Sequence, residues 1–404
     1  MKKHILTGFG FGPIQSGLFV AEAFKSGNFK RIVIAEIDQR LVDAVRANEG
    51  TYYINIAGVG GIETVEVKGI EIYNPTVEKD RLQIIDALAH STEIVTSLPS
   101  VKFYDAGENS VASLISAGLS NSKAEATIVY TAENNNHAAE ILEEVIQKKL
   151  GKIPANVQFL NTVIGKMSQV VTDKDEILQK NIKTISPGID RAFLVEEFNR
   201  ILVTKCNIKN YTPGIKVFLE KEDLLSFEEV KLFGHNAIHA LLGYLGAYKG
   251  YKKMSELAND KPIMQIARDA FLKESGAALV KKYSHLKDEL FTEAGYKKYA
   301  EDLLVRIVNP YLDDTTERAA RDPQRKLGPT DRIFGTMQLA LEYGVKPNNM
   351  AKGAAAGLIY LLKANQSNVN RQILSQKLKE IFAEDTGKHN AELIELTEKA
   401  FDNL

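Results

Sequence analysis

The sequence predicts an α/β domain built on a parallel sheet, followed by an all-α domain. Apolar runs with strand character alternate with helical patterns up to about residue 222, and helical spacing dominates from there onward. The length of 404 residues also exceeds what one hydrophobic core ordinarily covers. We therefore expect two domains, residues 1–222 and 223–404.

The composition narrows the class of protein. Lysine and arginine number 51 against 52 acidic residues, so no charge excess indicates a nucleic acid or an anionic membrane as partner. No run of about 18 apolar residues predicts a membrane-spanning helix. Cys206 is the single cysteine, which excludes a disulfide framework and a thiolate metal site. The first residues lack the apolar run and cleavage site of a signal peptide, and we expect a cytoplasmic protein.

A glycine-rich turn joins the first predicted strand to the first predicted helix. Gly8 and Gly10 match the first two glycines of the GxGxxG pattern, Gly12 follows, and Pro13 takes the third position. Such a turn lets backbone amides approach a pyrophosphate at a helix N-terminus. The unit predicts a Rossmann-type nucleotide loop, although a tight turn that binds nothing would have the same pattern. The predicted segments are the strand 4–9, the helix 14–25 and the strand 31–38.

An acidic residue closes the second predicted strand. The carboxylate of Glu36 is placed to accept hydrogen bonds from ribose hydroxyls, as in dinucleotide-binding folds. It would repel a 2′-phosphate, which favours NAD over NADP, and Asp38 strengthens this preference. Arg40 is close enough in sequence to leave NADP open.

Polar side chains follow three further predicted strands, at residues 93–100, 126–135 and 157–165. In open α/β sheets, ligands bind beyond the carboxyl ends of the strands. Ordinary turns after strands also favour asparagine and serine, so the alternative at each position is a structural role. The candidates at this edge are Thr96, Glu133 and Asn134 for the cofactor, and Asn161 for the substrate.

The stretch KLFGHNAIHALLG, residues 231–243, predicts one helix with an unusual polar arc. At about 100° per residue, Lys231, His235, His239 and Asn236 occupy less than half of its circumference. The arc is either a solvated face from which the lysine reaches water, or a face turned toward a substrate.

The segment from residue 309 to residue 332 is rich in arginine and carries interspersed acids, among them Asp313 and Asp314. Arginine forks match phosphate oxygens, which would make it an anion site. A solvated connection laced with surface ion pairs has the same composition and is favoured by composition alone. The basic candidates are Arg321, Arg325, Lys326 and Arg332.

Lys231, Asn236 and His239 reproduce the Lys-x₄-Asn-x₂-His signature of the polyol-specific long-chain dehydrogenases, the mannitol dehydrogenase family, which this sequence resembles. The resemblance implies NAD-dependent hydride transfer without a metal by a monomeric enzyme. It implies interconversion of mannitol 1-phosphate and fructose 6-phosphate, with another polyol, polyol phosphate or hexuronate-type sugar acid as the alternative. Further matching segments are TAEN at 131–134, FLNTVIGKM at 159–167, KESGAALVKKY at 273–283, NPYL at 309–312 and RDPQRKLGPTDR at 321–332.

The same resemblance implies roles for individual residues. Lys231 would be the general acid and base, which is chemically sensible because burial lowers the pKa of a lysine toward neutrality. Asn236 and Asn161 would donate hydrogen bonds to the developing alkoxide, and His239 would orient the substrate hydroxyls. The four basic candidates would hold a substrate phosphate. A nucleotide sensor without catalysis is disfavoured because the whole signature is present.

Overall fold

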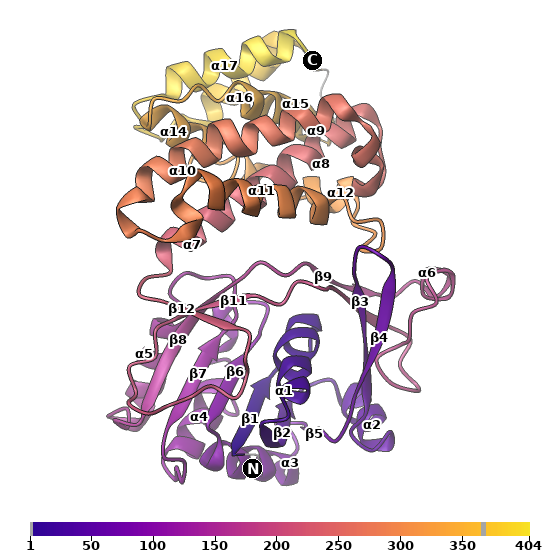
Figure 1. Cartoon of the computed structure of the whole chain (residues 1–404), viewed down its shortest axis with the longest axis vertical. Helices are drawn as coiled ribbons and strands as arrows, with labels where there is room; N and C mark the ends of the chain where they lie inside the picture. The colour runs from indigo at the N-terminus through magenta and orange to yellow at the C-terminus, as the bar shows by residue number, and fades with distance from the viewer. Residues whose placement is uncertain (1–2, 365–368) are drawn as a thin grey trace. The chain divides into compact units, whose positions relative to one another are not determined.

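The computed structural model describes residues 3–364 and 369–404 and divides into two compact units, Met1–Leu225 and Ser226–Leu404 (Figure 1). Residues 1–2 and 365–368, which belong to the two predicted domains, lie outside the described residues. Among the described residues, no helix combines the length and the apolar character needed to cross a membrane.

The first unit is built on an eight-stranded sheet in the order β12-β11-β8-β7-β6-β1-β2-β5. Neighbouring strands are parallel except for β8 and β11, which are antiparallel. The sheet confirms the α/β class and each of the five strands predicted from the sequence. Its strands are β1 (His4–Phe9), β2 (Phe29–Ala35), β5 (Glu71–Tyr73), β6 (Glu93–Thr96), β7 (Thr127–Thr131), β8 (Val157–Ile164), β11 (Ile201–Thr204) and β12 (Phe218–Lys221).

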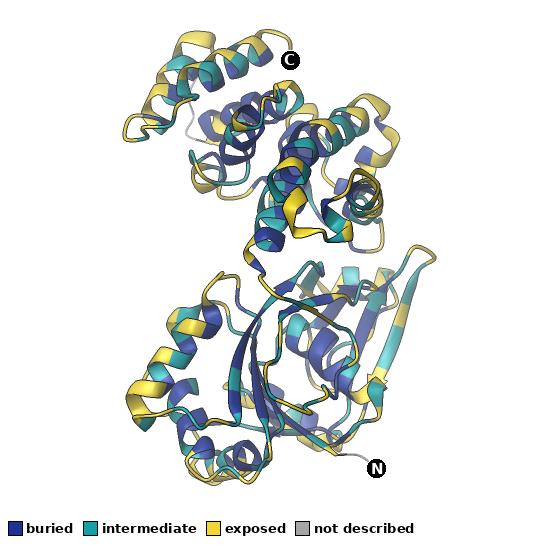
Figure 2. Ribbon diagram, turned by 60° about the vertical axis from the view of Figure 1, so that its left-hand side comes forward, coloured by how far each residue is buried: buried dark blue, intermediate teal, exposed yellow. Residues whose placement is uncertain are grey.

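Both faces of this sheet are covered, which explains why its central strands are continuous apolar runs (Figure 2). One face packs on three helices through a core that includes Leu88, Ile115 and Leu142. The other packs on the first helix and on a smaller sheet, with Leu18 and Phe193 in its core. The helices of the unit are α1 (Ala21–Ser26), α2 (Gln39–Ala47), α3 (Glu78–His90), α4 (Val111–Leu119), α5 (Ala138–Leu150) and α6 (Lys174–Gln179).

The smaller sheet, in the order β4-β3-β10-β9, is absent from the sequence prediction. Its strands β4 and β9 carry polar residues and do not alternate cleanly between buried and exposed positions, so they lack the pattern that marked the main sheet. Tyr52 at the start of β3 is fully buried, and its hydroxyl donates to the carbonyl of Ser16 in the first helix (2.8 Å). The strands are β3 (Tyr52–Ala57), β4 (Ile62–Val67), β9 (Ser168–Val171) and β10 (Ala192–Glu196).

The strand order reverses at β1, because β2 lies on one side of it and β6 on the other. The chain therefore leaves β1 and β6 toward opposite sides of the sheet. Such a switch point opens a crevice beyond the carboxyl ends of the two strands, where ligands of open α/β sheets bind. The glycine turn after Phe9 and the residues after Thr96 lie at this point.

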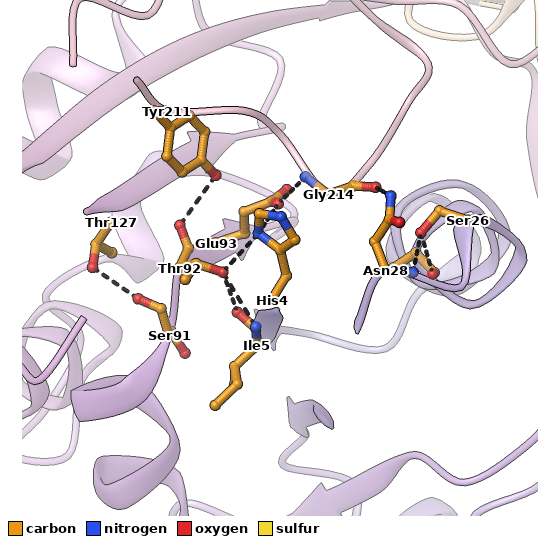
Figure 3. A network of polar contacts seen from close by, with 11 residues as sticks. His4, Ile5, Ser26, Asn28, Ser91, Thr92, Glu93, Thr127, Tyr211 and Gly214 are labelled. Carbon is orange, nitrogen blue, oxygen red and sulfur yellow. Dashed lines mark hydrogen bonds and ion pairs between the residues drawn. The ribbon is translucent and has the colours of Figure 1, made fainter. Parts of the chain in front are cut away.

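A buried polar network holds the main sheet at the amino ends of β1 and β6, opposite the ends where the glycine turn lies (Figure 3). Glu93, at the start of β6, has no exposed surface and accepts a hydrogen bond from the Gly214 N–H (2.6 Å). His4 lies 3.4 Å from the same carboxylate and contacts Thr92, whose carbonyl accepts from the Tyr211 hydroxyl. These contacts tie the segment after β11 to the amino ends of β1 and β6.

The second unit is entirely helical, as predicted. Its central helix, α8 (Ala237–Lys249), is almost wholly buried and packs against α12 (Thr316–Ala320) and α15 (Asn348–Ala364). Because α8 is held from two sides, the polar residues at its amino end have fixed positions. The other helices are α9 (Lys261–Asp269), α10 (Gly276–Tyr283), α11 (Glu293–Ile307), α13 (Pro323–Lys326), α14 (Phe334–Glu342), α16 (Arg371–Ile381) and α17 (Asn390–Asp402); α7 (Leu225–Glu229) spans the boundary of the units.

Candidate active site

Gly8, near the end of β1, and Gly10, in the turn after it, both lie in crowded positions. Gly10 has φ +81°, and a Cβ there would lie 2.9 Å from the Ser97 carbonyl oxygen. A Cβ on Gly8 would lie 1.9 Å from the Gln15 amide nitrogen, whereas one on Gly12 would meet nothing within 4 Å. A loop pressed this closely against the residue after β6 fits a backbone cradle for a pyrophosphate.

Glu36 fastens this loop from the end of β2. One carboxylate oxygen accepts the Phe11 N–H (2.8 Å) and the other accepts the Asp38 N–H (2.9 Å). Each oxygen keeps further lone-pair capacity for a ribose hydroxyl. Arg40 donates to Asp190 (2.7 Å) and to the Gly188 carbonyl (3.0 Å), so its charge is already matched.

Thr96 is the last residue of β6, and Glu133 follows shortly after β7. Their side chains contact each other. Glu133 is buried and accepts hydrogen bonds from the Thr96 hydroxyl (2.9 Å), the Leu98 N–H (2.8 Å) and the Tyr104 hydroxyl. Burial raises the pKa of its carboxyl group, against the effect of these donors. The network joins two strand ends at the ligand edge, and Asn134 follows it as an exposed residue.

The amide of Asn161 on β8 has a defined orientation. Its oxygen accepts the Ala139 N–H from α5 (2.9 Å), so the amide nitrogen points the other way and donates to Glu140 (2.8 Å). An amide has two N–H donors, and the contact with Glu140 uses one of them. The amide nitrogen is therefore a donor of fixed orientation.

Lys231 and Asn236 lie on a π-helical turn, η3 (Val230–Asn236), between α7 and α8. The α-helical angles assumed from the sequence therefore do not apply here. Lys231 and Asn236 belong to the same π-helical segment, which widens the helix locally. The Phe233 carbonyl inside the turn accepts the Ser275 hydroxyl (2.7 Å), a residue of the KESG segment. π-Helical turns occur frequently at functional sites.

The ammonium of Lys231 lies near charges of both signs. The pKa of Lys231 is lowered to about 8, chiefly by burial; the charge of Glu228 opposes this shift, and the smaller effect of Arg332 adds to it. The neighbouring His235 is buried, and its pKa is held well below the usual value by burial and by the charges of His239, Arg306 and Lys231. A half-buried lysine of this kind exists in both protonation states near neutral pH.

His239, one turn further along, contacts a buried carboxylate. Its Nε2 lies 2.7 Å from Asp314 Oδ2, and the other oxygen of Asp314 accepts from Arg318 (2.9 Å). From the sequence, Asp314 was predicted only as one of the acids of the basic segment. The sequence prediction also missed Arg306, whose charge acts on His235 and which directly precedes the segment 309–332.

The four basic candidates differ in their surroundings. Arg325 is exposed and pairs with Asp322 (2.6 Å) and Asp331 (3.4 Å). Arg332 is largely buried and donates to Asp331 (2.7 Å). Lys326 is buried and donates to the Ala319 carbonyl (2.6 Å), whereas Arg321 is exposed. Arg332 is therefore the candidate whose charge reaches Lys231.

Comparisons with known proteins find relatives among the polyol dehydrogenases. The mannitol dehydrogenase C-terminal domain family matches residues 223–403. Mannitol-1-phosphate 5-dehydrogenases of Buchnera aphidicola are 29% identical, one from the Acyrthosiphon pisum subspecies over 94% of this chain and 91% of its own length, and one from the Baizongia pistaciae subspecies over 87% and 86%.

Two solved structures share the fold. The Pseudomonas fluorescens mannitol 2-dehydrogenase ternary complex with NAD and D-mannitol is 18% identical, with a TM-score of 0.68 over 100% of this chain and 92% of its own. A D-sorbitol dehydrogenase in substrate-free form is 14% identical, with a TM-score of 0.77 over 99% and 93%. The resemblance to the polyol-specific long-chain dehydrogenases is thereby confirmed, and residues 223–403 match the mannitol dehydrogenase C-terminal domain.

Proposed function

We propose that this chain is an NAD-dependent dehydrogenase that interconverts mannitol 1-phosphate and fructose 6-phosphate. The observation that carries the proposal is Lys231 on its π-helical turn, with its pKa lowered to about 8 and with Arg332 acting on it. The Buchnera relatives carry the name of this activity, and the P. fluorescens structure holds NAD. A cytoplasmic, monomeric enzyme stays a prediction.

Lys231 supplies the proton chemistry in this proposal. Its neutral amine takes the proton of the substrate hydroxyl during oxidation, and its ammonium returns a proton to the oxygen during reduction. NAD, when bound, accepts the hydride from carbon. Gly8, Gly10 and Glu36 would hold the nucleotide, a role that their geometry fits.

The amides of Asn161 and Asn236 would stabilise the developing negative charge on the substrate oxygen. The contact with the Ala139 N–H supports this role for Asn161, because it takes the amide oxygen and leaves the amide nitrogen, which also donates to Glu140, as the donor. For Asn236 the support is its place five residues after Lys231 in the π-helical turn. Donors that are fixed before the reaction cost no reorganisation in the transition state.

Basic side chains near Lys231 support a phosphorylated substrate. The charge of Arg332 acts on Lys231 and His235, that of Arg306 acts on His235, and both arginines have carboxylate partners, Asp331 (2.7 Å) and Asp302 (3.1 Å). A substrate phosphate would compete with these carboxylates for the guanidinium groups, whereas a neutral polyol would leave the ion pairs as they are. We assign the phosphate first to Arg332, and place Arg321, Arg325 and Lys326 behind it.

Replacing Arg332 with leucine is expected to raise KM for mannitol 1-phosphate roughly 10–100-fold, because one charge-assisted hydrogen bond is lost. It should also move the pH midpoint of activity upward, since the charge of Arg332 lowers the pKa of Lys231. Steady-state kinetics with Arg325→Ala as the matched surface control would measure both effects. A larger loss for Arg325→Ala would transfer the phosphate to the exposed segment.

The function itself is tested by NADH formation with mannitol 1-phosphate, compared with mannitol and sorbitol 6-phosphate. We expect turnover with mannitol 1-phosphate to exceed the others by at least about tenfold in kcat/KM, a difference of about 1.4 kcal/mol. Equal turnover with mannitol would remove the phosphate from the proposal. Turnover only with a hexuronate, in the direction of NADH oxidation, would support the alternative substrate class.

A further inference from the structure

His239 is oriented by a carboxylate that lies 75 residues away in the sequence. The Asp314 side chain is 4% exposed, and its two oxygens contact His239 Nε2 (2.7 Å) and Arg318 Nη1 (2.9 Å). Burial alone would raise the pKa of Asp314, but the hydrogen bond and charge of His239 and the charge of Arg318 outweigh it and lower the pKa to about 2. The group is therefore a carboxylate at any pH at which an enzyme of this kind works.

The backbone around Asp314 is fastened on both sides. Its carbonyl accepts the Met254 N–H (2.8 Å), and the preceding Asp313 pairs with Lys253 (2.7 Å). Thr316 donates from its backbone to the Lys252 carbonyl (3.0 Å) and from its hydroxyl to the Tyr251 carbonyl (2.7 Å). The carboxylate is thus held still, and the imidazole must adapt to it.

A carboxylate can only accept hydrogen bonds, so the His239 nitrogen that faces Asp314 must carry a proton. In a neutral imidazole the other nitrogen, Nδ1, then has a lone pair and no hydrogen. It can accept a hydrogen bond from a hydroxyl group, but it cannot donate one. The contact with Asp314 therefore sets the polarity of the His239 face that remains for a ligand.

We propose that Asp314, balanced by Arg318, is a positioning residue that fixes His239 as the Nε2–H tautomer and makes Nδ1 an acceptor for a substrate hydroxyl. The part of this inference that concerns a substrate hydroxyl rests on the proposed function. The part that concerns the His239 tautomer does not. Arg318 takes the second oxygen of Asp314, so the carboxylate is shared and the His239 ring is held by one hydrogen bond in one orientation.

The tautomer can be measured without substrate. The chain has seven histidines, and ¹⁵N-histidine labelling with His239→Gln for assignment identifies the two ring nitrogens of His239 by NMR. At a pH at which the imidazole is neutral, we expect a protonated Nε2 and an unprotonated Nδ1 in the wild type, and a mixture of tautomers in Asp314→Asn. A protonated Nδ1 in the wild type, or an unchanged single tautomer in Asp314→Asn, would overturn the assignment even if the variant folded poorly.

Kinetics test the substrate half. Asp314→Asn should raise KM for mannitol 1-phosphate about 10–100-fold with a smaller fall in kcat, since an orienting hydrogen bond is weakened. Asp260→Asn is the matched control, because Asp260 is also a buried carboxylate of this unit, paired with Lys249 (2.9 Å) at the far end of α8. It should leave the His239 tautomer unchanged. If no polyol is turned over by the wild type, the proposed function fails while the NMR result still decides the positioning role.

Discussion

Lys231→Met is expected to lower kcat for polyol oxidation about 10²–10⁴-fold, the usual contribution of a positioned general base. Methionine keeps most of the side-chain volume but cannot titrate. The wild type should show kcat/KM for oxidation rising tenfold per pH unit below about 8 and level above it, because only the neutral amine takes the hydroxyl proton. Reduction needs the ammonium and should show the opposite dependence.

A second lysine makes a sharp control for this experiment. Burial lowers the pKa of Lys326 to about 8 as well, so an inflection near pH 8 does not by itself identify the base. Lys326→Met should keep the inflection whatever its effect on turnover, whereas Lys231→Met should abolish it. An inflection that disappears only in Lys326→Met would reject Lys231 as the base.

Features that local residue patterns determine could be predicted from the sequence, and features that depend on contacts between distant segments could not. The strands β1 and β7 were predictable because strands buried on both faces are rich in apolar residues. The smaller sheet was not, because β4 and β9 lack such apolar runs and β3 pairs with β10, a strand more than 100 residues further along the chain.

The same distinction applies to the candidate site. The spacing of Lys231, Asn236 and His239 is a local pattern, so it could be recognised in the sequence. The π-helical turn was missed because contacts from elsewhere support it, such as the Ser275 hydroxyl on the Phe233 carbonyl. The first π-helical turn, η1 (Gln15–Val20), has a similar contact from Tyr52 to Ser16. In both turns a carbonyl accepts a hydroxyl group from another element, and no local periodicity reports that.

Partners of charged residues were equally invisible in the sequence. The basic segment 309–332 predicted an anion site or a set of surface ion pairs; the structure contains ion pairs, and the anion site stays a prediction. Arg325 is an exposed, paired residue, while Arg332 is largely buried and acts on Lys231. Composition cannot separate the two, because the difference lies in burial and in contacts made across the unit.

The second large effect is expected on the free energy of unfolding and comes from Glu93, at the amino end of β6. Burial raises the pKa of Glu93 to about 8, against the hydrogen bonds that it accepts. The neighbouring His4 offers no compensating charge, since burial and Lys3 lower its pKa. The hydroxyls of Tyr130 and Tyr211 face the same group and are uncharged, because their pKa values are raised.

The sign of the pH dependence follows from these pKa values. Because the folded-state pKa of Glu93 lies above the unfolded value of 4.5, its contribution to stability is fully present below about pH 4.5 and is lost as the pH rises to about 8. Glu93→Gln keeps an acceptor for the Gly214 N–H and never ionises. We expect it to be more stable than the wild type by about 2–4 kcal/mol at pH 8, and to approach the wild type near pH 4.

Thermal unfolding of the full chain between pH 4.5 and 9 measures this difference. A gain of roughly 5–10 °C in Tm at pH 8 corresponds to the expected free energy for a unit of this size. Glu125→Gln, at an exposed position before β7, is the matched control and should follow the wild-type curve. If Glu93→Gln is less stable than the wild type at pH 8, Glu93 is ionised in the folded protein. The network in Figure 3 would then be held by a buried negative charge.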